Sequence, residues 1–191
     1  MWITTRARTQ LAARAVLALG LTLTAVAAGS PETFTAKAVV KSPQASASSA
    51  VTIQIDRFVS DADRDRLMTV FKANDDHAAR EALTKMADIG FIDVAGKRSA
   101  IKYAYARPSG GGRLITVVTA SPLLFLGGAA PDAKPREGFN HAIALMSLDG
   151  ANSGEGELAP AARVRVDANG AIVTKDYGPE VVRLTSISKT K

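Results

Sequence analysis

The chain has 191 residues, of which 47% are hydrophobic and 22% charged, a composition that supports one globular core. It contains no cysteine, which excludes disulfides, thiolate metal sites and a cysteine nucleophile. The formal charge is +6, but three of the 24 basic residues lie in the first 28 positions, where there is no acidic residue. The small positive excess that remains does not indicate nucleic-acid binding.

Residues 1–28 are typical of a secretory signal peptide. They carry three arginines, an apolar run from about Ala15 to Val26, and small residues at Ala25 and Ala27 that fit a cleavage site. This apolar run is shorter than the roughly 20 residues that span a bilayer, although a retained N-terminal anchor is the alternative. We therefore expect an exported protein, periplasmic or extracellular, with no transmembrane segment after removal of the signal.

Residues 29–50 are rich in Ser, Ala and Pro and have no sustained apolar period. Such a composition buries too little surface to offset the entropy of ordering. It predicts a flexible linker, followed by a single folded domain at 51–191.

The domain begins with a strand and two helices. Apolar and polar residues alternate over residues 51–56, which predicts a half-buried strand. Ser60, with Asp63 three positions later, predicts a helix start, and Asn74 or Asp75 predicts a second. Gly90 suits the left-handed position that ends a helix. The buried stripes expected on the two helices are Leu67, Val70 and Phe71, then Ala79, Leu83 and Met86.

After Gly90 the period becomes that of strands. Residues 91–94, 101–107, 113–119, 142–148, 156–158, 162–166, 171–174 and 181–188 form separate strand patterns, divided by Gly-, Asn- and Pro-rich turns. The connections are too short for helical crossovers, so most pairings should be antiparallel. The predicted fold class is α+β: a mostly antiparallel sheet of about eight strands, with two short helices packed on one face.

These segments resemble a family of small exported bacterial proteins with no assigned activity. The matching text includes VTIQIDRF, IGFI, the tyrosine and arginine at Tyr105 and Arg107, GGR at 111–113, and GEGEL at 154–158. The family reads Thr-Asp-Arg-Pro followed by Phe-Trp-Glu, whereas residues 119–122 here read TASP and residues 125–127 read FLG. The resemblance implies export and a common fold, and it implies no mechanism.

Metal-binding and phosphate-binding patterns are weak. The histidines are His77 and His141, and the acids Asp75 and Asp76 beside His77 are explained by the start of a helix. Residues 61–66, DADRDR, lack the Gly and Glu of a calcium loop, which favours a charged helix start. Residues 108–113, PSGGGR, precede a strand rather than a helix, which favours a hairpin turn. We therefore expect no metal and no cofactor.

Two further groups are candidates for a site. Glu155 and Glu157 share one strand face, as paired acid–base carboxylates do, but such pairs are also common on solvated strands. Tyr103, Tyr105 and Arg107 share another face and offer stacking and hydrogen-bond donors to a ligand. The alternative, which we favour, is that these tyrosine rings face the core. No catalytic residue is assigned, and the binding residues remain unknown.

The most apolar stretch is LITVVTASPLLFLGG, at residues 114–128. Its first half predicts a central strand buried on both faces, ended by Pro122. In its second half, the four apolar side chains at 123–126 either fold over the core or form an exposed patch, and we expect at least Phe125 to be buried.

The sequence thus favours an exported, non-enzymatic binding or interaction module whose partner is an envelope protein or a small ligand. The alternative is an exported hydrolase or lyase, which would require a pocket where His77, His141, Glu155 or Glu157 converge.

Overall fold

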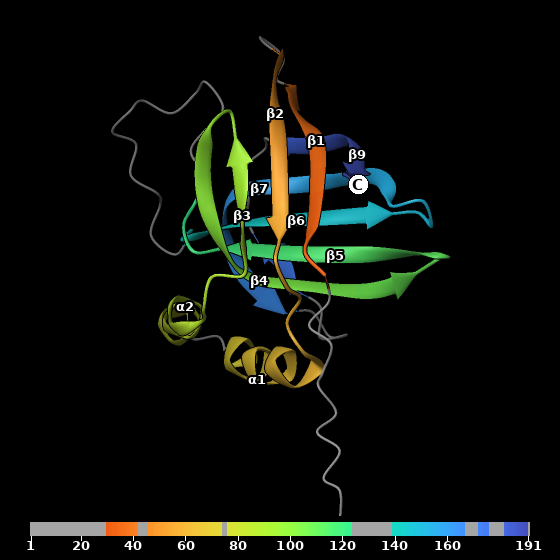
Figure 1. The fold of residues 1–191 in the computed structure, drawn as a ribbon. Helices are drawn as coiled ribbons and strands as arrows, with labels where there is room; N and C mark the ends of the chain where they lie inside the picture. Colours follow the sequence, from red (N-terminus) through yellow and green to blue (C-terminus); the bar gives the residue numbers. More distant parts are fainter. Residues whose placement is uncertain are drawn as a thin grey trace, which may run out of the picture.

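The computed structural model describes residues 30–41, 46–73, 76–123, 139–166, 172–175 and 182–190 (Figure 1). Its helices in these residues are α1 (Asp61–Lys72) and α2 (Asp76–Lys85). Its strands there are β1 (Glu32–Lys41), β2 (Ser46–Ile55), β3 (Gly90–Val94), β4 (Lys97–Ser109), β5 (Gly112–Thr119), β6 (His141–Leu148), β7 (Ser153–Val166), β8 (Ile172–Lys175) and β9 (Val182–Lys189).

The described strands form a mostly antiparallel sheet, as predicted, and this sheet closes on itself. Its order is β6–β5–β4–β3–β2–β1–β9–β7–β8, and β7 also pairs with β6. Eight strands therefore make a closed barrel, and β8 is added to β7 outside the ring. Figure 1 shows β1 and β2 crossing in front of β5, β6 and β7 at a steep angle. Closure leaves none of the eight ring strands as a free edge over its paired length.

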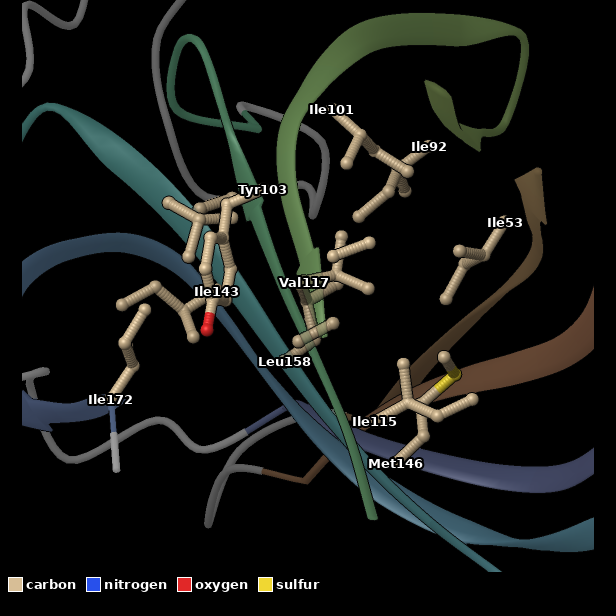
Figure 2. Packing of buried hydrophobic residues seen from close by; sticks show 14 of the residues in the cluster. Ile53, Ile92, Ile101, Tyr103, Ile115, Val117, Ile143, Met146, Leu158 and Ile172 are labelled. Carbon is tan, nitrogen blue, oxygen red and sulfur yellow. The ribbon is translucent and has the colours of Figure 1, made fainter. Parts of the chain in front are cut away.

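Aliphatic side chains make up most of the core. Side chains from six ring strands meet in Figure 2, and each of them is at most 1% exposed: Ile53, Ile92, Ile101, Ile115, Val117, Met146 and Leu158. Complete burial of one such side chain contributes roughly 1.5–3 kcal/mol.

The prediction of a flexible linker at residues 29–50 is wrong for residues 30–41 and 46–50, which the structure describes. Residues 32–41 form β1, and β2 begins at Ser46 rather than at residue 51. Phe34 and Ala38 are fully buried. β1 pairs with β2 on one side and with β9 on the other, where Lys37 lies opposite Thr185. The segment is thus ordered by pairing with β9, a strand from the far end of the sequence. The local composition of residues 29–50 gives no information about this pairing. The proposed signal peptide at 1–28 lies outside the described residues.

A cluster of charges joins β1 to β5 and β9. The Nη2 atom of Arg113 lies 2.8 Å from Oε2 of Glu32, and Nζ of Lys189 donates to Oε1 at 2.9 Å. Nη2 of Arg113 also donates to Oδ1 of Asn152 at 2.7 Å. Burial would raise the pKa of Glu32, but Arg113 and Lys189 together hold it below its ordinary value. The guanidinium of Arg113 also lies 5.6 Å from the centre of the Phe34 ring.

Several local predictions are confirmed. Val51, Ile53 and Ile55 are buried on β2, while their polar neighbours are half-buried or exposed. The PSGGGR segment makes the tight turn between β4 and β5, with positive φ at Gly110 and Gly111.

Two other predictions need correction. The patterns at 156–158 and 162–166 belong to one continuous strand, β7. The first half of β5 is only partly buried, so full burial on both faces is limited to its end, at Val117, Val118 and Thr119.

The prediction that Gly90 ends a helix is also wrong. Helix α2 ends at Lys85, and Gly90 instead begins β3, opposite Ile55 on β2. Its φ is +146°, and a Cβ atom there would collide with the carbonyl oxygen of Gln54. Glycine is required at this position because two strands approach closely, and not because a helix ends.

Candidate functional site

A groove of about 330 Å³ opens where helices α1 and α2 meet the segment that follows β2. The two helices lie together on one side of the barrel, beneath β4 in Figure 1. Helix α1 contacts α2 and β7, and α2 contacts β4 and β7. The groove is lined by Arg57, Val59, Asp63, Arg66, Leu67, Val70, Ala82, Met86 and Ala87.

The segment between β2 and α1 is fixed by two backbone hydrogen bonds. The N–H of Asp56 donates to the carbonyl of Ile89 at 2.8 Å, and the N–H of Val59 donates to the carbonyl of Ala104 at 2.9 Å. Val59 is buried, whereas Arg57 is exposed. Both residues line the groove.

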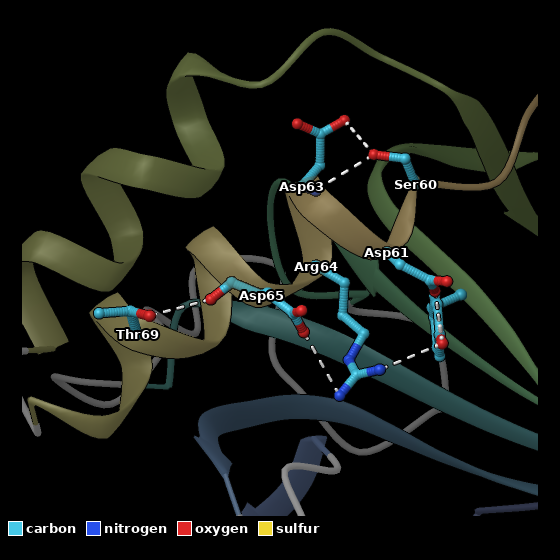
Figure 3. A network of polar contacts seen from close by, with 7 residues as sticks. Ser60, Asp61, Asp63, Arg64, Asp65 and Thr69 are labelled. Atoms are coloured by element: carbon cyan, nitrogen blue, oxygen red, sulfur yellow. Dashed lines mark hydrogen bonds and ion pairs between the residues drawn. The ribbon is translucent and has the colours of Figure 1, made fainter. Parts of the chain in front are cut away.

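Helix α1 begins with the cap that the sequence predicts (Figure 3). The hydroxyl oxygen of Ser60 accepts a hydrogen bond from the backbone N–H of Asp63 at 3.1 Å, and the hydroxyl donates to Oδ2 of Asp63 at 2.9 Å. Nη1 of Arg66 lies 3.5 Å from the other carboxylate oxygen of Asp63. The single carboxylate in the groove lining is therefore already engaged by its own helix.

A polar network holds α1 against β4 (Figure 3). The hydroxyl of Tyr105 donates to Oδ1 of Asp61 at 2.9 Å and accepts from Nη1 of Arg64 at 3.2 Å. The Arg64 guanidinium also lies 5.1 Å from the centre of the Tyr105 ring. This network fixes one wall of the groove to the barrel.

Helix α2 supplies the opposite wall. Ala79 and Leu83 are buried, which confirms the predicted stripe for these two residues. Met86, its third predicted member, lies just after α2 and is half-buried in the groove. Nζ of Lys102 on β4 donates to the carbonyl of Met86 at 2.9 Å and lies 2.7 Å from Oδ1 of Asp88. These contacts fix the end of α2, so both walls are attached to the same strand.

The tyrosine group predicted from the sequence has a structural role. Tyr103 is buried, and its ring is tilted against that of Tyr105 at a centroid distance of 6.4 Å. Burial raises the pKa of Tyr103 far above its ordinary value. Arg107 is exposed at the far end of the strand face. The preferred interpretation, a core-facing ring, is thus confirmed for Tyr103, while the Tyr105 hydroxyl is used to hold α1.

The hydrolase or lyase alternative requires a pocket where His77, His141, Glu155 or Glu157 converge. None of these four residues lines the groove. His77 is exposed on α2, and Glu155 and Glu157 are exposed on β7. His141 is buried: its Nδ1–H donates to the carbonyl of Thr119 at 2.9 Å, and burial lowers its pKa. Within the described ranges, no three His, Asp or Glu side chains gather closely enough to hold a metal ion.

Residues 119–122 lie in a compact polar cluster. The hydroxyl of Thr119 accepts from the N–H of Ala142 at 2.8 Å and donates to the carbonyl of Ser121 at 2.6 Å. The hydroxyls of Ser99 and Ser121 lie 3.0 Å apart. Leu123 is buried, whereas Phe125 and the rest of the apolar run at 124–128 lie outside the described residues.

The groove itself is not predicted by sequence reasoning. Leu67, Val70 and Met86 belong to stripes assigned to the core, and Arg57 had no assigned role. The available signal is the pair of small residues Ala82 and Ala87 beside these stripes, since small side chains leave space between adjacent helices.

Comparison with known proteins adds no relative: no family model, curated protein or solved structure matches this chain. Neither α1 nor α2, the helices formed by the described residues, has the length and apolar content that a membrane crossing requires.

Proposed function

We propose that this chain is an exported, non-enzymatic binding module that takes the apolar part of a ligand into the groove between α1, α2 and the segment after β2. One observation carries the proposal: six of the nine described lining residues are apolar, and the groove is open to solvent. A volume of about 330 Å³ lies at the lower end of the range of small-ligand pockets, roughly 300–1,000 Å³.

The chemistry of the lining supports binding rather than catalysis. Its described residues include no histidine, glutamate, serine or threonine, and the one aspartate among them, Asp63, is engaged as part of the cap of α1. Acid–base or nucleophilic catalysis needs such a group within reach of the bound molecule. Export remains a proposal supported by the signal-like residues 1–28, and kinship with the family of exported bacterial proteins by the order of the shared motifs.

The test is a titration of the full chain with N-phenyl-1-naphthylamine, an uncharged apolar dye that fluoresces when it leaves water. We expect saturable binding that Val70→Lys weakens by about tenfold or more, because a charge in the apolar lining is costly to desolvate. Thr69→Lys is the matched control, since Thr69 is exposed on the same helix and does not line the groove.

Absence of saturable dye binding to the wild type would refute the proposed function. Undiminished binding by a Val70→Lys variant with a native circular dichroism spectrum would do so as well.

A further inference from the structure

The charges at the groove are unevenly compensated. Asp63 and Arg66 lie 3.5 Å apart, and the Asp63 carboxylate also accepts a hydrogen bond from the Ser60 hydroxyl, while the Asp63 backbone N–H donates to that hydroxyl oxygen. No described carboxylate pairs with Arg57, which lines the same groove and is exposed. Among the described residues, the groove therefore carries one guanidinium without a carboxylate partner, beside an apolar surface.

The polar and apolar parts of the groove are separated along α1. Asp63 and Arg66 lie in its first turns, Leu67 lies beside Arg66, and Val70 lies one turn further on. At 1.5 Å per residue, the rise from Asp63 to Val70 is about 10 Å. On the other wall, Ala82, Met86 and Ala87 add only apolar surface. The groove thus offers a cationic group and an apolar trough of limited length.

We propose that the ligand is an amphiphilic carboxylate with an unbranched aliphatic chain, and that Arg57 binds its carboxylate. This inference rests on the proposed function, because it concerns the same groove. The planar guanidinium presents paired N–H donors that match the two oxygens of a carboxylate. Meanwhile the chain of the ligand contacts Leu67, Val70 and Met86, whose flexible thioether side chain adapts to an irregular apolar surface.

Charge complementarity favours this ligand class over a neutral one. A cation-bearing amphiphile would meet Arg57 and be repelled, while a neutral alcohol would leave Arg57 without an ion-pair partner. Charge-assisted hydrogen bonds are roughly twice as strong as neutral ones, so the carboxylate should bind about tenfold more tightly than an alcohol of equal chain length.

The experiment measures displacement of N-phenyl-1-naphthylamine from the full chain by decanoate and by 1-decanol at neutral pH. In the wild type, decanoate should displace the dye at about one-tenth of the decanol concentration. In Arg57→Gln, we expect this preference to vanish, because decanoate loses its charge-assisted hydrogen bonds. Arg98→Gln is the control, because Arg98 lies on β4 against Asp93 and Phe91, away from the groove.

A second variant gives a shift of the opposite sign. Asp63→Asn removes the one negative charge of the lining, so the preference for decanoate over decanol should increase. Asparagine keeps the side-chain oxygen that contacts Ser60, which preserves most of the cap of α1.

The outcomes separate this inference from the proposed function. Equal displacement by decanoate and decanol would overturn the carboxylate assignment and leave the apolar groove intact, whereas absence of any dye binding would overturn both. Preferential displacement by a short apolar peptide with a free C-terminal carboxylate, and not by decanoate, would assign the groove to a protein partner and overturn the inference. So would a dimer in solution that Val70→Lys dissociates, because a second copy would then occupy the groove.

Discussion

Substitution of Phe34 by alanine tests directly whether β1 belongs to the folded barrel. Phe34 is fully buried, and it sits opposite Ile53 of β2 and Lys189 of β9. If residues 29–50 were a flexible linker, Phe34→Ala would change the free energy of unfolding by less than about 0.5 kcal/mol. The barrel predicts a large loss, because the side chain is removed from the core.

The magnitude follows from what the ring contacts. Truncation of a buried phenylalanine to alanine typically costs about 3–5 kcal/mol, which includes the cavity left behind. The cation–π contact with Arg113, at 5.6 Å, accounts for up to about 1 kcal/mol of this. Since a domain of this kind is stabilised by about 5–15 kcal/mol in total, the variant should fold but unfold much more readily.

The assay is urea unfolding followed by circular dichroism. With a slope of about 2 kcal/mol per molar urea, the midpoint of Phe34→Ala should fall by roughly 2 M. Lys37→Ala is the control on the same strand. The Lys37 side chain is exposed, and the hydrogen bond from the Thr185 hydroxyl goes to the backbone carbonyl of Lys37, which the substitution keeps. A midpoint for Phe34→Ala within error of the Lys37→Ala midpoint would show that β1 is not part of the cooperative core.

Two other predictions concern polar contacts. At about pH 7 the wild type should be about 1–3 kcal/mol more stable than Glu32→Gln, because the substitution leaves Arg113 and Lys189 without their shared carboxylate. The pKa of Glu32 in the folded protein lies below its ordinary value of 4.5. The stability difference between the wild type and Glu32→Gln should therefore persist above pH 4.5 and shrink as the pH falls through the folded pKa. Urea unfolding that gives the same stability difference at about pH 3 as at about pH 7 would contradict this prediction. Tyr105→Phe removes the hydrogen bonds to Asp61 and Arg64, so we expect a loss of about 1–2 kcal/mol. Thermal unfolding of Tyr105→Phe, Asp61→Asn and the double variant should give a double-variant loss smaller than the sum of the single losses, and full additivity would argue against the contact.

Features that depend on a few neighbouring residues could be predicted from the sequence. The alternation over residues 51–56 specifies a half-buried strand in β2, and Ser60 with Asp63 specifies the start of α1. The glycines at 110 and 111 supply the positive φ that the hairpin turn needs. Each of these signals is complete within about one turn of helix or one hairpin, so no distant partner is required to interpret it.

The tertiary structure decided what depends on distant partners. β1 is a strand because β2 and β9 flank it, and β9 pairs with it across almost the whole chain, as Lys37 opposite Thr185 shows. Closure of the barrel depends in the same way on the pairing of β6 with β7. Gly90 is needed because β2 passes close to it, which its local context does not indicate.

The candidate site follows the same rule. Its lining comes from three segments, and the apolar stripe of each helix is visible in the sequence. A stripe specifies that a side chain avoids water, but the placement of the two helices decides whether it is sealed in the core, as Leu83 is, or left at an open groove, as Val70 is. The sequence by itself thus determined the amphipathic elements, while the packing of α1 and α2 against the barrel decided that Arg57 would face an apolar trough.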